Sequence, residues 1–138
     1  MKKAVIVVGS HWSGKSRTII EFFKPLVGLS GLQRSFSIGE SKGSVLSQSL
    51  EEKNGQIISQ SAEEKGLDNV KDFVNKYAHF DKLVFAARPS NETPSLYLAL
   101  KDELKKHGFN VHTEEVVKGQ ADSVTIDIAN RMYAHLQC

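Results

Sequence analysis

The sequence predicts an α/β fold with three layers, in which helices cover both faces of a mostly parallel five-stranded sheet. Apolar runs of strand length alternate with segments of helical period along the chain. The runs at 3–8 and 82–87 are continuously apolar, as expected for strands that are covered on both faces. With 138 residues the chain is long enough for a single core, and we expect one domain over residues 1–138.

Strands and helices are expected to alternate strictly. The expected strands cover residues 3–8, 34–38, 56–60, 82–87 and 109–113, and residues 114–117 can extend the last one. The first helix starts at Lys15 and is closed by Pro25. Further helices are expected behind a cap at Asp68 or Asn69, behind Thr93-Pro94 with an end at Gly108, and over residues 121–136.

Residues 45–65 allow two interpretations, because "VLSQSLEEK" (45–53) and "IISQSAEEK" (57–65) are near copies. The copies can form a hairpin around Asn54-Gly55, which is a strong hairpin signal. Alternatively, the first copy is a helix capped by Ser44 and ended by Gly55, and the second copy supplies the strand at 56–60. We favour the helix followed by a strand, because it keeps the alternation unbroken.

The loop after the first expected strand, "GSHWSGKS" (9–16), matches the pattern G-x-x-x-x-G-K-[ST]. Gly9 and Gly14 permit backbone angles at which successive N–H groups can surround a phosphate, and the following helix adds its positive end. In this pattern Lys15 bridges the β- and γ-phosphates, and the Ser16 hydroxyl binds Mg²⁺. The loop therefore predicts a nucleotide site, with ATP or GTP as the ligand.

On these residues the chain resembles the P-loop nucleotide-binding family over about its first twenty-four residues. Its alternating order is similar to that of the small P-loop nucleoside and nucleotide kinases. The resemblance implies a P-loop after strand 1, a nucleotide at the C-terminal edge of the sheet and Lys15 stabilising a transferred phosphoryl group. The residues expected to contact the nucleotide are Gly9, Ser10, His11, Trp12, Ser13, Gly14, Lys15, Ser16 and Arg17.

The sequence departs from this family in its second acidic site. P-loop enzymes usually place an aspartate at the end of a neighbouring strand, where it holds the Mg²⁺ shell. The expected strands end in Ser59-Gln60-Ser61 and in Arg88 instead. Glu63 is the candidate second metal residue, with Glu40 as another substitute, although a solvated turn is the simpler interpretation of Glu63-Glu64.

Two further contacts are expected. A lid bearing several arginines is missing, and Arg88 is the candidate catalytic arginine, since the loop 88–93 leaves a strand that is expected to flank the first. The loop after the last strand, "VVKGQADS" (116–123), lies where P-loop kinases contact the base, so Lys118 and Gly119 are candidates for that contact. The resulting function is a phosphotransferase or NTPase acting on a small-molecule or protein acceptor. The alternative is a nucleotide-binding module without turnover.

Composition argues against several other classes. Eighteen basic and sixteen acidic residues give a net charge of +2, and the basic residues are scattered, which does not indicate nucleic acid or a membrane surface as a partner. No apolar run approaches the ~18 residues of a membrane span. A single cysteine, Cys138, excludes an intrachain disulfide, so we expect a cytoplasmic protein. The five histidines show no metal-ligand spacing and are expected to be unrelated surface or loop residues.

Overall fold

The computed structural model describes residues 2–10, 13–31, 33–49, 62–91 and 95–137, and for 48–49 and 62–69 it describes the backbone alone. The sheet has five strands in the order β2-β3-β4-β1-β5. Strand β1 pairs in parallel with β4 and β5, β3 pairs in parallel with β4, and β2 is antiparallel to β3. The strands are β1 (Lys3–Val8), β2 (Ser35–Ile38), β3 (Ser41–Ser49), β4 (Lys82–Ala87) and β5 (Asn110–Glu115). The expected α/β class with a mostly parallel five-stranded sheet is confirmed.

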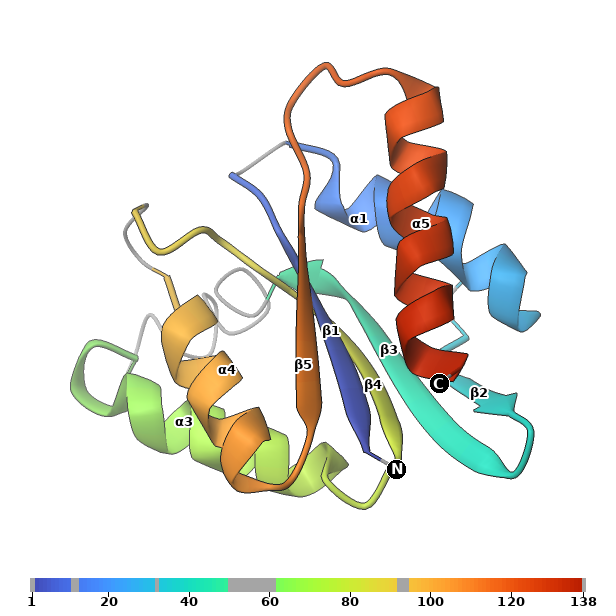
Figure 1. Cartoon of the computed structure of the whole chain (residues 1–138). Coiled ribbons are helices and arrows are strands. Elements are labelled where there is room, and N and C mark those ends of the chain that lie inside the picture. Colours follow the sequence, from blue (N-terminus) through green and yellow to red (C-terminus); the bar gives the residue numbers. More distant parts are fainter. Residues whose placement is uncertain (1, 11–12, 32, 50–61, 92–94, 138) are drawn as a thin grey trace.

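Helices cover both faces of this sheet (Figure 1). On one face lie α5 and a helical segment that begins as α1 and continues as the π-helix η1 and the 3-10 helix η2. On the other face lie α3 and α4. The bounds are α1 (Lys15–Arg17), η1 (Thr18–Phe23), η2 (Lys24–Val27), α3 (Ala62–Tyr77), α4 (Tyr97–Lys106) and α5 (Asp122–Gln137). None of the helices in these described ranges is long and apolar enough to cross a membrane.

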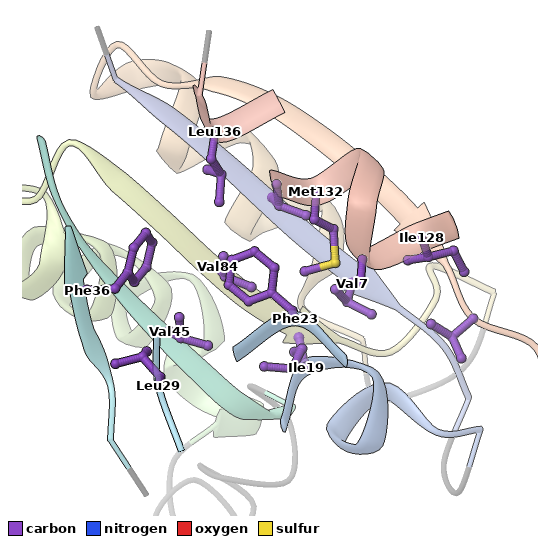
Figure 2. Close-up of a cluster of buried hydrophobic side chains, with 14 residues drawn as sticks. Val7, Ile19, Phe23, Leu29, Phe36, Val45, Val84, Ile128, Met132 and Leu136 are labelled. Atoms are coloured by element: carbon purple, nitrogen blue, oxygen red, sulfur yellow. The ribbon is translucent and has the colours of Figure 1, made fainter. Parts of the chain in front are cut away.

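The core is divided into two layers by the central strands, β1 and β4, which are buried at every position. Side chains of successive residues point to opposite faces, so Ile6 packs with the α3–α4 layer and Val7 with the α5 layer. Figure 2 shows the second layer, where Phe23 meets Met132 and Leu136 of α5 over the sheet. Each fully buried side chain of this size contributes roughly 1.5–3 kcal/mol relative to exposure.

The favoured interpretation of residues 45–53 as a helix is wrong for the part that the structure describes. Residues 41–49 form β3, which pairs with β4 in parallel. Val45 packs into the α5 layer and Leu46 into the α3–α4 layer, so each of these neighbouring residues is buried on a different face. A helix would place both on similar sides, and tertiary pairing therefore overrides the helical pattern. The hairpin at Asn54-Gly55 and the strand expected at 56–60 lie outside the described residues.

Two helix starts also differ from expectation. Helix α3 begins at Ala62, so Asp68 and Asn69 lie inside it and Glu63 and Glu64 belong to its first turn rather than to a solvated loop. Helix α4 begins at Tyr97, and the expected Thr93-Pro94 start lies outside the described residues. The end of α4 is as predicted. Gly108 has φ 86° just after the last helical turn, a conformation that glycine adopts without strain.

Candidate functional site

The candidate site lies at the carboxyl edge of the parallel strands. There β1 is followed by the Gly9–Ser16 loop, β4 by Arg88, and β5 by residues 116–121 (Figure 1). Strand β1 is flanked by β4 and β5, and Val8 is in register with both Ala87 and Glu115. The chain leaves β1 for the helical segment on one face of the sheet, whereas it leaves β4 for α4 on the other face. Adjacent strands whose connections go to opposite faces form a switch point, where open α/β sheets bind ligands.

Two glycines shape the Gly9–Ser16 loop. A Cβ atom on Gly9 would lie 2.2 Å from Ser13 Oγ and 3.0 Å from the carbonyl oxygen of Val116, so only a hydrogen fits there. Gly14 has φ 100°, a backbone conformation that side chains disfavour. Between them, the Ser13 amide donates to the carbonyl of Ser10 at 3.0 Å. Gly14 therefore has the kind of backbone conformation that the motif predicts, whereas Gly9 has no positive φ and is required because a Cβ atom would not fit.

Lys15 is folded into this loop and is only 5% exposed. Its Nζ atom donates to the carbonyl oxygen of Gly9 at 2.5 Å and to that of Ser10 at 3.0 Å. The helical segment starts at the same residue, and no side chain caps it. An ammonium group and the positive end of a helix thus lie together beside the loop, which favours an anion.

Two serines of the loop differ in environment. Ser16 is exposed in the first helical turn, where its hydroxyl is accessible to a metal ion that accompanies a ligand. Ser13 is buried, and its hydroxyl has no hydrogen-bond partner among the described residues. Leaving a buried hydroxyl without a hydrogen bond costs free energy, and Ser13 lies where the loop borders the cavity described next.

A cavity of about 210 Å³ lies beside the loop, between the start of the helical segment and the chain that connects β5 to α5. It brings together two residues that the sequence singled out from distant positions, Arg17 and Gly119. Lys118, the other candidate for base contact, is exposed and does not line the cavity. The lining residues are Ser13, Gly14, Arg17, Thr18, Val116, Val117, Gly119, Gln120 and Thr125.

Gln120 connects the residues that line the cavity on the side of the β5–α5 connection. The side-chain carbonyl of Gln120 accepts from the Val117 amide at 3.0 Å, and its amide group donates to Thr125 Oγ1 at 2.9 Å. Gly119, beside it, has φ 80°. The sequence did not indicate Gln120 or Thr125, because their role depends on a contact between a loop and the first turn of α5.

Arg17 connects the two helical elements that flank the cavity. Its guanidinium group lies 2.7 Å from Glu21 of its own segment and 3.1 Å from Asp122 at the start of α5. The hydrogen bond to Asp122, followed by the attraction of that carboxylate, raises the pKa of Arg17 above its usual value. These groups are exposed, so the pairing orients Arg17 more than it stabilises the fold.

The other candidate residues occupy different places. Arg88 follows β4 directly beside β1, is half-buried, and its carbonyl oxygen accepts from Ser95 Oγ at 2.8 Å. Glu63 lies in α3, and its side chain is outside the description. Glu40 lies in the turn between β2 and β3, at the opposite edge of the sheet, so it cannot supply the second acid. His11 and Trp12 lie outside the described residues.

One carboxylate at the carboxyl edge of the sheet, that of Glu115, was not predicted as a candidate site residue. Glu115 ends β5, is exposed and is in register with Val8. Strand alternation puts it on the face of Thr113, whose hydroxyl is 2.9 Å from the Tyr97 hydroxyl of α4. The helical segment from Lys15 covers the other face. The sequence allowed the last strand to extend over residues 114–117. Taking this extension as part of the strand would have placed Glu115 at its end.

A polar cluster between β5 and α5 also corrects the expectation for the histidines. Glu114 accepts two hydrogen bonds from Arg131, at 2.8 and 2.9 Å, and lies 2.5 Å from His112 Nε2. The rings of His112 and His135 are stacked with their centres 5.1 Å apart, and His135 Nε2 lies 3.0 Å from the carbonyl oxygen of Asn110. These two histidines are thus connected through one cluster rather than unrelated.

Burial and hydrogen bonding act together on the pKa values of Glu114 and His135. It opposes the ionisation of Glu114, but the hydrogen bonds from Arg131 and His112 outweigh it, and the pKa of Glu114 is lower than usual. Burial lowers the pKa of His135, and the nearby charges of His112 and Lys3 act in the same direction. Within the described ranges, no three His, Cys, Asp or Glu side chains gather in a group that could hold a metal ion.

Comparisons of the chain with protein-family models, with curated proteins and with solved structures find no match.

Proposed function

We propose that the chain is a small nucleotide-binding protein whose Gly9–Ser16 loop holds the phosphates of ATP or GTP together with Mg²⁺. The observation that carries the proposal is the position of Lys15, whose buried ammonium group is bound to the Gly9 and Ser10 carbonyls of the loop. An ammonium held at this place meets a phosphate with little loss of side-chain entropy.

The fit of a phosphate is supported by the backbone rather than by side chains. The position of Gly9 leaves no room for a Cβ atom, so the backbone approaches Ser13 and the Val116 carbonyl closely there. Ser16 supplies an exposed hydroxyl for Mg²⁺. The neighbouring cavity of about 210 Å³ is suited to part of the nucleoside, with Gly119 and Gln120 on its far side.

Arg88 favours an enzyme that transfers or hydrolyses the terminal phosphate. A cation that follows the strand next to β1 is placed to stabilise charge on a transferred phosphoryl group, and the bound metal would polarise that group. A phosphotransferase or NTPase acting on a small-molecule or protein acceptor is therefore one form of the proposal. The other form is a module that binds the nucleotide without turnover, and it is favoured by Ala87-Arg88, where an enzyme would end the strand in an acid.

Calorimetry with Mg-ATP and Mg-GTP tests the binding. We expect Lys15→Ala to weaken binding by about a hundredfold, because it removes the charge inside the loop. Lys105→Ala is the matched control, since Lys105 is exposed on α4. Ser16→Ala should remove the enhancement of binding by Mg²⁺ and leave metal-free binding unchanged. Equal affinity in Lys15→Ala and in the original chain would refute the proposal.

Phosphate release, measured alone and with a panel of nucleosides and small alcohols, separates the two forms. For an enzyme, Arg88→Ala should lower the rate while affinity is kept, and Glu63→Gln tests the remaining candidate acid. A chain that binds Mg-nucleotide but releases no phosphate under any of these conditions is the binding module.

A further inference from the structure

The cavity beside the Gly9–Ser16 loop is too small for a whole nucleotide. Its volume is about 210 Å³, whereas pockets that enclose ligands of drug size measure about 300–1,000 Å³. Gly14 of the loop lines the cavity, and Val116 and Gly119 line it on the side of the β5–α5 connection. With the triphosphate in the loop, the cavity is left for a part of the nucleoside, and the chemistry of its wall determines which part fits.

Most polar side chains around the cavity are already held by contacts within the chain. Thr18 Oγ1 donates to the Gly14 carbonyl at 2.8 Å. The Gln120 side chain accepts from the Val117 amide at 3.0 Å and donates to Thr125 Oγ1 at 2.9 Å. The Val117 carbonyl in turn accepts from the Gln120 amide at 3.2 Å. These contacts leave few groups that could distinguish the edge of one base from that of another.

Two further features of the wall limit what the cavity can recognise. Ser13 Oγ has no partner among the described residues, but it is buried against Gly9, where an added Cβ would lie 2.2 Å from it. The described lining residues also include no aspartate or glutamate. The exocyclic amino group of guanine is a hydrogen-bond donor, and it therefore finds no carboxylate in this wall.

Arg17 is placed to act through the flat face of its guanidinium group. Its Nε atom donates to Glu21 at 2.7 Å and Nη2 donates to Asp122 at 3.1 Å, so donors at its edges are taken. Its Cζ atom also lies 5.1 Å from the centre of the Phe22 ring. The group is thus held in position, while the side chain stays 51% exposed and lines the cavity. A guanidinium group of this kind can stack on a planar ring.

We propose that the nucleobase enters this cavity and stacks on Arg17, and that adenine and guanine bind equally well. The proposal rests on the nucleotide site in the Gly9–Ser16 loop. Val117, which is exposed and lines the cavity on the side of the β5–α5 connection, supplies an apolar contact across from Arg17. Stacking does not distinguish the two bases, because every base has a flat π-face. Arg17 therefore contacts the base rather than the phosphates.

Calorimetry with Mg-ATP, Mg-GTP and Mg-tripolyphosphate, which has no base, tests the proposal. We expect ATP and GTP to bind within about threefold of each other, and tripolyphosphate to bind about tenfold more weakly. Arg17→Lys keeps the positive charge but removes the planar group. It should weaken both nucleotides by about fivefold and leave tripolyphosphate unchanged. Arg34→Lys, the same exchange at an exposed arginine before β2, is the matched control and should bind all three ligands normally.

The same titrations separate a failure of the stacking proposal from a failure of the nucleotide site. Lys15→Ala should weaken all three ligands, and an unchanged affinity for tripolyphosphate in this variant would refute the phosphate site itself. With the effect of Lys15 present, a preference of more than about tenfold for one base overturns the stacking proposal. So does Arg17→Lys if it leaves nucleotide affinity unchanged, or if it weakens tripolyphosphate as much as the nucleotides. Circular dichroism of each variant checks that the fold is retained.

Discussion

The Gly9–Ser16 loop and the polar cluster between β5 and α5 belong to the same sheet, but backbone geometry shapes the loop, whereas side-chain contacts form the cluster. The loop is shaped by backbone, because Gly9 leaves no room for a Cβ atom and Gly14 has a positive φ. The cluster is built from charged side chains, with Glu114 held between Arg131 and His112. A small increase in side-chain volume should therefore impair the loop, whereas changes of charge or pH should alter the stability that the cluster contributes.

This difference predicts a large effect of Gly9→Ala, although the change adds only a single methyl group. The added Cβ would meet Ser13 Oγ at 2.2 Å and the Val116 carbonyl at 3.0 Å, so the loop must move. We expect nucleotide binding to be lost and the free energy of unfolding to fall by about 1–3 kcal/mol, as is typical of overpacking. Calorimetry and urea unfolding measure the two effects. Ser10→Ala, at the exposed neighbouring position, should bind as the original chain does.

Glu114→Gln is the corresponding test of the cluster. The change keeps the shape of the side chain but removes the charge that accepts hydrogen bonds from Arg131 and His112. We expect the free energy of unfolding to fall by about 1–2 kcal/mol, because a nearly buried hydrogen-bonded charge is lost. Nucleotide affinity should not change. A loss of affinity equal to that of Gly9→Ala would show that the two regions are not separate.

The pH dependence of stability should come from the cluster rather than from the loop. Burial lowers the pKa of His135 in the folded chain, so below about pH 6.5 the unfolded chain takes up a proton more readily. Stability should be full above this pH and decrease as the pH falls toward the lower folded pKa. Glu114, whose pKa is also lowered, loses its stabilising charge at still lower pH, below its usual carboxylate range.

Urea unfolding at pH 8, 6 and 5 measures this dependence. His135→Gln should flatten the decrease between pH 8 and 5. His79→Gln, which changes an exposed histidine after α3, is the control and should leave the slope as it is. An unchanged slope in His135→Gln would assign the pH dependence to another group.

The smallest effect is expected for Asp122→Asn. It breaks the exposed ion pair with Arg17 at the rim of the cavity. Exposed pairs contribute little to stability, so the urea midpoint should stay within experimental error. The change of charge should instead alter nucleotide affinity slightly through the orientation of Arg17, and calorimetry in low and high salt would detect it.

Local signals were sufficient for much of this molecule. The apolar runs at 3–8 and 82–87 located β1 and β4, because strands covered on both faces have no polar alternation to obscure them. Gly108 located the end of α4, and the spacing of Gly9, Gly14 and Lys15 located the loop that follows β1. In each case burial or backbone conformation is determined by residues close together in the sequence, so it can be predicted from the sequence.

Contacts between residues far apart in the sequence were not predicted. The segment around Val45 has a helical pattern but forms β3, since pairing with β4 buries its neighbouring residues on two faces. The Arg17–Asp122 pair joins residues 105 positions apart, and the wall formed by Gln120 and Thr125 exists only because α5 begins beside the loop. Composition and periodicity do not encode such contacts.

The sequence by itself determined an α/β fold, its central parallel strands and a Gly-Lys-Ser loop at the end of the first of them. The tertiary structure decided how β2 and β3 join the sheet, which strands form its edges, and how Arg17, Gly119 and the loop come to line one cavity. The reason is physical. Backbone conformation and continuous burial are set by adjacent residues, whereas register, edges and cavities depend on which distant segments pack together.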